Sequence, residues 1–135
     1  AALARARSYA LARGVETRCL AILDDAGAPR RHLLAVECRS TPTGAWWCVS
    51  RTSALPDWVA FLDTGDRFTN IVFRADGSCR REDEAESADD AGWLRLELVH
   101  AARLFQHDDS AGLDDPRYRR ALEINRRTGL TREAP

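Results

Sequence analysis

The sequence contains neither lysine nor methionine. All 20 of its basic residues are arginines, a bias typical of a bacterial-like, GC-rich genome. Because arginine stays protonated at physiological pH, this chain offers no Schiff-base lysine, no phosphate-binding ammonium group and no lysine general base. Chemistry that depends on a lysine is therefore excluded from it.

An excess of charge of one sign is also missing. The 20 basic residues face 21 acidic ones, and the net charge is −1. A protein that coats nucleic acid needs a broadly basic surface, so only a local basic patch remains available for that role. The length of 135 residues, with 44% hydrophobic and 30% charged residues, predicts one globular domain over residues 1–135.

Long hydrophobic runs are absent as well. No apolar run approaches the ~20 residues that a membrane-spanning helix needs, so we expect no contact with a membrane. The four cysteines stand alone, without the C-x-x-C pairs of a zinc ribbon, and we expect neither a metal nor another cofactor. Unpaired cysteines inside predicted strands favour a reduced, cytoplasmic protein.

Hydrophobic periodicity predicts an α+β fold with the element order α-βββ-α-ββ-α-α. An Ala- and Arg-rich helix ends at Gly14, and a hairpin follows it. The turn Thr41-Pro42-Thr43-Gly44 then leads into a third strand that opens on two tryptophans. The five predicted strands, at residues 17–23, 32–39, 46–51, 68–74 and 78–81, form a mainly antiparallel sheet with helices packed on it.

Three further helices are predicted after the third strand, over residues 56–64, 91–106 and 115–128. The middle one rests on an apolar stripe that begins with Leu94 and Leu98 and continues at helical spacing. Residues 82–90 read EDEAESADD and predict a solvated acidic linker. Residues 130–135 are expected to be a loose tail.

One polar constellation lies on the predicted hairpin. Asp24 or Asp25 ends its first strand, and Glu37-Cys38-Arg39 ends its second. This order loosely resembles the PD-(D/E)XK nucleases, including Holliday-junction resolvases, over about residues 1–75. The resemblance implies that an Asp and Glu37 hold a divalent metal, with Arg39 at the position of the family's lysine. Arginine is a poor base, and the alternative is a turn of acidic residues plus a cross-strand Glu–Arg pair.

A second constellation is a basic patch on the last predicted helix. Arg117, Arg120 and Arg127 would share its surface and could contact phosphates. An exposed Trp47 or Phe68 on the sheet could add a stacking platform for single strands. This pattern predicts a nucleic-acid-binding accessory protein; the alternative is a solvated helix whose arginines balance nearby acids.

We favour a third interpretation, a non-catalytic protein-binding module. No nucleophile motif or phosphate-binding loop is present, and the first and last helices have thin apolar faces. The element order is similar to that of class I type III secretion chaperones. An adaptor, chaperone-like or immunity-type subunit is expected, binding a protein partner or a second copy through one face of its sheet or through the central helix. Trp46 and Trp47 are the candidate contact residues.

Overall fold

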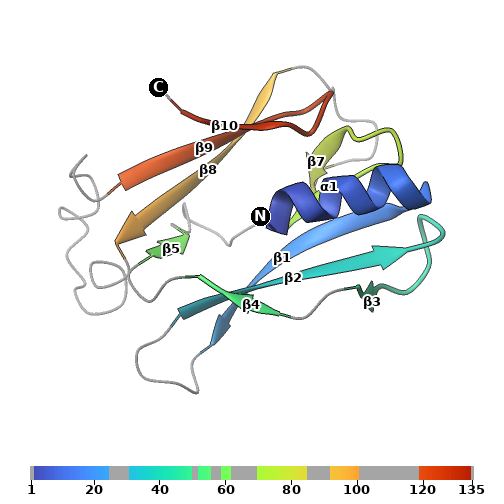
Figure 1. Cartoon of the computed structure of the whole chain (residues 1–135), viewed down its shortest axis with the longest axis horizontal. Coiled ribbons are helices and arrows are strands. Elements are labelled where there is room, and N and C mark those ends of the chain that lie inside the picture. Colours follow the sequence, from blue (N-terminus) through green and yellow to red (C-terminus); the bar gives the residue numbers. More distant parts are fainter. Residues whose placement is uncertain are drawn as a thin grey trace.

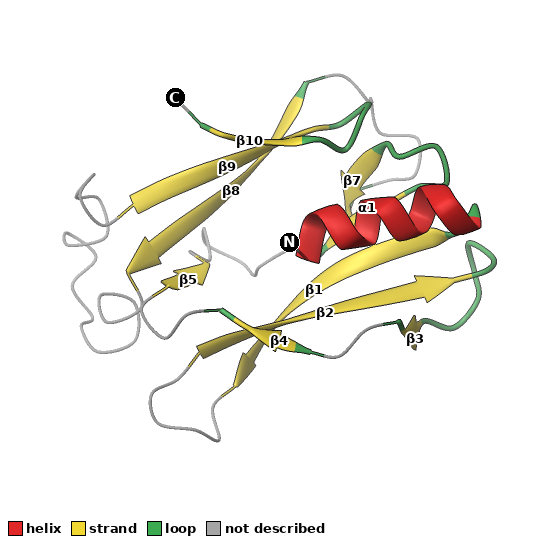
Figure 2. Ribbon diagram, viewed as in Figure 1, coloured by secondary structure: helices red, strands yellow, loops and turns green. Residues whose placement is uncertain are grey.

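The computed structural model of the chain describes residues 2–24, 31–49, 52–55, 59–61, 70–84, 92–100 and 119–134. These residues form an α+β fold of one helix and two antiparallel sheets (Figures 1 and 2). Within these ranges no helix is long and apolar enough to cross a membrane. The elements are α1 (Ala2–Arg13), β1 (Glu16–Asp24), β2 (Arg31–Arg39), β3 (Trp47–Cys48), β4 (Ser53–Ala54), β5 (Val59–Phe61), β6 (Ile71–Phe73), β7 (Cys79–Arg81), β8 (Trp93–His100), β9 (Arg119–Asn125) and β10 (Thr131–Glu133).

The first sheet, which we call sheet A, contains the five strands predicted from the sequence. Its order is β3-β2-β1-β6-β7, and the short strand β4 also pairs with β2. The long β1–β2 hairpin is in register from Glu16 opposite Arg39 to Asp24 opposite Arg31. The prediction of a mainly antiparallel sheet is therefore confirmed. The strand that opens on the two tryptophans was expected at the centre of this sheet, but β3 lies at its edge and is only two residues long.

Helix α1 packs on one face of sheet A, against β1, β2 and β6. Ala2, Ala6 and Ala10 recur every fourth residue and are buried, so a stripe of small side chains lets the helix lie close to the strands. The Gly14 amide donates to the Ala10 carbonyl at 2.9 Å, and Gly14 has a φ of 64°. A residue at positive φ ends the helix there, as predicted.

The second sheet, sheet B, overturns two of the predicted helices. Its order is β10-β9-β8-β5. Residues 93–100, predicted as the main core helix, form β8; residues 119–125, predicted as part of the last helix, form β9. Residues 94–98 alternate between leucine and a charged residue, and Leu94 and Leu96 reach the core together, as a strand allows and a helix does not.

Three other predictions also differ from the structure. Residues 59–61 of the predicted helix 56–64 form β5, and the rest of that segment lies outside the described residues. The predicted loose tail contains β10, which pairs with β9. The acidic segment 82–90 is described only through Glu84, and there Glu82 and Glu84 form ion pairs with the two sheets.

The hydrophobic core lies between the helix-covered face of sheet A and the inner face of sheet B. The two sheets also meet at one corner. The Cys79 amide of β7 donates to the carbonyl of Arg126, just after β9, at 2.7 Å. The Arg81 guanidinium donates to the Arg95 carbonyl of β8 at 2.7 Å. Core side chains come from α1 (Ala6, Ala10), sheet A (Cys19, Val36, Ile71, Phe73, Cys79) and sheet B (Leu94, Leu96, Ile124).

Candidate protein-binding surface

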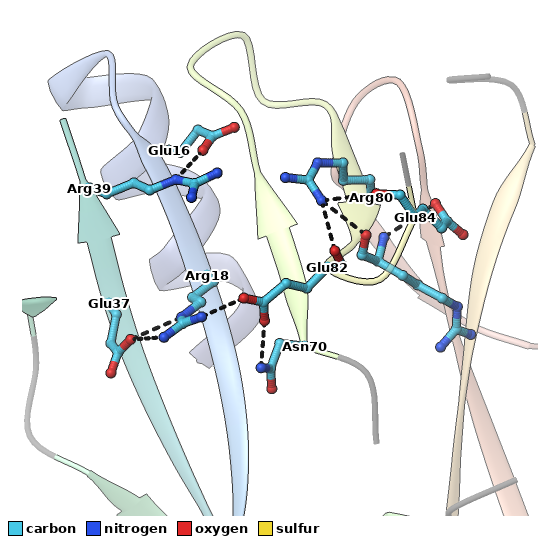
Figure 3. A network of polar contacts seen from close by, with 9 residues as sticks. Glu16, Arg18, Glu37, Arg39, Asn70, Arg80, Glu82 and Glu84 are labelled. Atoms are coloured by element: carbon cyan, nitrogen blue, oxygen red, sulfur yellow. Dashed lines mark hydrogen bonds and ion pairs between the residues drawn. The ribbon is translucent and has the colours of Figure 1, made fainter. Parts of the chain in front are cut away.

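The outer face of the β1–β2 hairpin carries a network of ion pairs (Figure 3). Arg18 lies opposite Glu37 and donates to its Oε2 atom from Nε at 2.9 Å and from Nη2 at 2.6 Å. The third nitrogen, Nη1, donates to Glu82 of the acidic segment. Asn70 donates to the other oxygen of Glu82 at 2.6 Å. One guanidinium thus holds two carboxylates from distant parts of the chain.

Trp46 lies under two guanidinium groups on this face. The Cζ atoms of Arg18 and Arg39 are each 4.4 Å from the centroid of its ring. Arg39 also donates from Nε to Glu16 Oε2 at 2.6 Å. These contacts account for a half-buried tryptophan and show that its role in the described structure is to pack against the hairpin.

The register separates the carboxylates required by the nuclease hypothesis. Asp24 is six residues along β1 from Arg18, which lies opposite Glu37, so the two backbone positions are roughly 20 Å apart. Asp25 lies outside the described residues. Arg39, placed at the family's lysine position, is paired with Glu16. Throughout the described ranges, no group of three or more His, Cys, Asp or Glu residues could hold a metal ion.

The other predicted contact residues are scattered. Trp47 is 49% exposed on β3. Arg120 is exposed in β9, whereas Arg127 is exposed in the turn that follows this strand. Because residues 119–125 are extended, these two arginines do not share the face of a helix. Phe68 and Arg117 lie outside the described residues.

The four cysteines are free thiols in the structure. Cys19, Cys38 and Cys79 are buried, and burial raises the pKa of the Cys19 thiol to about 11. A thiol with such a pKa is almost entirely protonated at neutral pH and is a weak nucleophile. Cys48 on β3 is exposed, unlike the other three.

The outer face of sheet B presents a surface that the sequence analysis did not identify. Trp93 lies opposite Asn125, and the backbone N–H of Asn125 donates to the Leu130 carbonyl at 2.9 Å. The three residues therefore form one row across β8, β9 and the residue that precedes β10. Trp93 is 40% exposed and Leu130 is 56% exposed. Arg132 covers the Trp93 ring at 3.7 Å and donates to Glu123 Oε1 at 3.1 Å. We call Trp93, Leu130 and Arg132 the sheet B surface.

Signals for the strand and the turn that carry this surface were present in the sequence. Residues 94–98 read LRLEL, an alternation of apolar and polar residues that is typical of a half-buried strand, and Trp93 precedes them. Asn125 and Gly129 bracket the turn between β9 and β10, and both residue types are common in turns. The helical interpretation of residues 91–106 relied on the spacing of Leu94 and Leu98 rather than on the alternation. It therefore did not predict that Trp93 is exposed.

A further ion pair fixes the corner between the sheets. Arg126 donates to both carboxylate oxygens of Glu84, at 2.6 and 2.8 Å. These hydrogen bonds and the nearby positive charge hold the pKa of Glu84 below its usual value. Arg80, buried in β7, donates from Nη1 to the carbonyls of Arg81, Glu82 and Glu84 and so orders the start of the acidic segment.

Comparison with protein-family models, with curated proteins and with solved structures found no significant match for this chain.

Proposed function

We propose that this chain is a non-catalytic protein-binding module, an adaptor, chaperone-like or immunity-type subunit of a larger assembly. One observation carries the proposal: Trp93 and Leu130, two large apolar side chains, are exposed in the same row of the sheet B surface. A stable fold has no need to gather such side chains on an open sheet face. A partner that covers them would remove apolar surface from water.

The composition of the surface suits a protein partner. Tryptophan and arginine are enriched where interfaces contribute most of their binding energy. Arg132 already lies over Trp93 and pairs with Glu123, so both side chains are held in place before a partner arrives. Binding would therefore lose little side-chain freedom at these positions.

The charged face of sheet A is less suited to this role. Arg18 and Arg39 are engaged by Glu37, Glu82 and Glu16, and Trp46 is held beneath them. A partner would have to displace these short ion pairs. We therefore assign the contact to sheet B, and Trp47 on β3 serves as the comparison position.

The test compares two variants of exposed apolar residues. The tagged wild type, Leu130→Ser and Trp47→Ala are used to capture proteins from a native extract, and light scattering measures self-association of the same samples. We expect a partner, or a dimer, that the wild type and Trp47→Ala retain and that Leu130→Ser loses. A strictly monomeric wild type whose captured proteins are the same for all three samples would overturn the proposal.

A further inference from the structure

Strand β10 forms an edge of sheet B, and its register shows which backbone groups face outward. The Asn125 amide donates to the Leu130 carbonyl, and the Ala134 amide donates to the Ala121 carbonyl, both at 2.9 Å. Bonded and non-bonded pairs alternate in an antiparallel ladder, so Thr131 and Glu133 occupy non-bonded positions. Their N–H and C=O groups point away from β9.

These outward groups lie on an accessible edge. Residues 131–133 are exposed along their whole length, and β9 is the one strand that pairs with β10 among the described residues. The exposed Leu130 immediately precedes this edge, in the same row of the sheet B surface as Trp93 and separated from it by Asn125 of β9. The edge therefore combines four backbone hydrogen-bonding groups with a neighbouring apolar contact.

We propose that a partner protein adds an extended segment to β10 as an antiparallel fifth strand of sheet B. This inference rests on the proposed function and specifies how the partner binds. Strand addition would satisfy the N–H and C=O groups of Thr131 and Glu133, and a side chain of the added segment would lie against Leu130. Main-chain bonds give such a complex its affinity, and side chains give it selectivity.

The charges of β10 define the chemistry of the added segment. An antiparallel segment would place one residue opposite Glu133 and the next opposite Arg132, so a basic residue followed by an acidic one is complementary to the edge. A β-branched residue opposite Thr131 and an apolar residue opposite Leu130 complete the pattern. The expected segment reads basic, acidic, β-branched, apolar from its amino to its carboxyl end.

The same charges disfavour pairing with a second copy through this edge. An antiparallel pair related by a two-fold axis at Arg132 would place two arginines opposite each other. A two-fold axis at Glu133 would do the same with two glutamates. Like charges directly opposite each other weaken a strand pair, so these two registers are disfavoured. A two-fold axis at Thr131 avoids them but would leave Leu130 opposite the charged Arg132 rather than an apolar residue.

The test uses a synthetic peptide, acetyl-Gly-Ser-Arg-Asp-Val-Leu-Ser-Gly-amide, and three versions of the full chain. In Thr131→Pro the outward N–H is lost, yet the bonds to β9 from the neighbouring positions remain. Thr131→Val keeps the N–H and is the matched control. We expect the peptide to shift the amide NMR signals of Thr131 and Glu133, and Thr131→Pro to weaken its binding at least ~10-fold relative to Thr131→Val.

Charge exchange supplies a second measurement. Glu133→Arg should weaken binding of the peptide, and a peptide with Glu in place of its Arg should restore it. No shift at Thr131 or Glu133, or equal binding by Thr131→Pro and Thr131→Val, would overturn strand addition. If Leu130→Ser nevertheless loses its captured partner, the proposed function stands with a different mode of contact; if Leu130→Ser keeps it, the proposed function itself fails.

Discussion

Gly129, in the turn between β9 and β10, occupies a position that admits no side chain. Its φ is 70°, a conformation that favours glycine, and it packs against the β6–β7 turn of the other sheet. A Cβ atom here would lie 2.3 Å from the carbonyl oxygen of Gly77 and 3.1 Å from Phe73 Cε1. The turn that presents Leu130 therefore depends on a missing side chain.

Gly129→Ala should destabilise the protein by about 3 kcal/mol or more, because backbone strain and a clash with backbone occur together. Gly14→Ala is the matched control, since Gly14 has a φ of 64° and nothing within 4 Å of its added Cβ. The control should lose only about 1 kcal/mol. Urea denaturation measures both, and equal losses for the two variants would contradict the packing described at Gly129.

Thr17 is a second residue whose environment makes a sharp prediction. It is fully buried on the core face of β1, and its hydroxyl has no hydrogen-bond partner. Thr17→Val keeps the shape and removes the unsatisfied polar atom, so we expect a gain in stability of about 1 kcal/mol. Thr17→Ser keeps the hydroxyl, loses a methyl group and should be less stable than the wild type. Thermal unfolding distinguishes these outcomes.

Among the elements, the β1–β2 hairpin depends most on its ion pairs. Arg18→Met keeps much of the apolar stem but leaves Glu37 and Glu82 without their shared cation. We expect a loss of about 1–2 kcal/mol from partly buried, charge-assisted hydrogen bonds. A double-mutant cycle with Glu37→Gln should show a coupling energy of at least ~0.5 kcal/mol. Additive effects of the two substitutions would mean that the pair contributes no interaction of its own.

The individual elements also differ in how well they could be predicted from the sequence. The β1–β2 hairpin was found because turn residues separate two runs of strand-forming residues. Segment 93–100 was misassigned because leucines spaced by four also fit a helix. For this segment and for 119–125, the pairing that decides between helix and strand is between residues distant in the sequence. Cross-strand partners such as Leu94 and Ile124 become visible only when the sheet is formed.

For the whole molecule, the Glu84–Arg126 pair predicts a dependence of stability on pH. The folded protein lowers the pKa of Glu84 below its ordinary value of 4.5, so the carboxylate stabilises the fold above that pH. This contribution disappears as the pH falls through the lowered pKa. Glu84→Gln should cost about 1 kcal/mol at pH 7, with the difference from wild type shrinking below pH ~4.5.

Denaturant titrations between pH 3 and pH 7 measure this effect. Glu133→Gln, on the exposed edge strand, is the control for loss of one negative charge. The free energy of unfolding of this control should stay within ~0.5 kcal/mol of the wild-type value at pH 7. If the free energies of unfolding of Glu84→Gln and the wild type differed by the same amount from pH 3 to pH 7, the ion pair would not be the source of the pH dependence.

The candidate surface is also a property of the whole molecule. Trp46 and Trp47 are the contact residues predicted from the sequence; in the structure Trp46 lies under two arginines, whereas Trp47 is exposed. Trp93 and Leu130 are 37 positions apart in the sequence and meet only through β9. No local pattern joins two such residues, so this surface could be recognised only after sheet B was known.

The hydrogen bond from the Cys79 amide to the Arg126 carbonyl joins the two sheets directly. Opening either sheet at this corner would break this bond, which joins an amide of sheet A to a carbonyl just after β9 of sheet B. Deuterium should therefore enter the centres of β6 and β9 at similar, slow rates, because both become accessible in the same rare, cooperative opening.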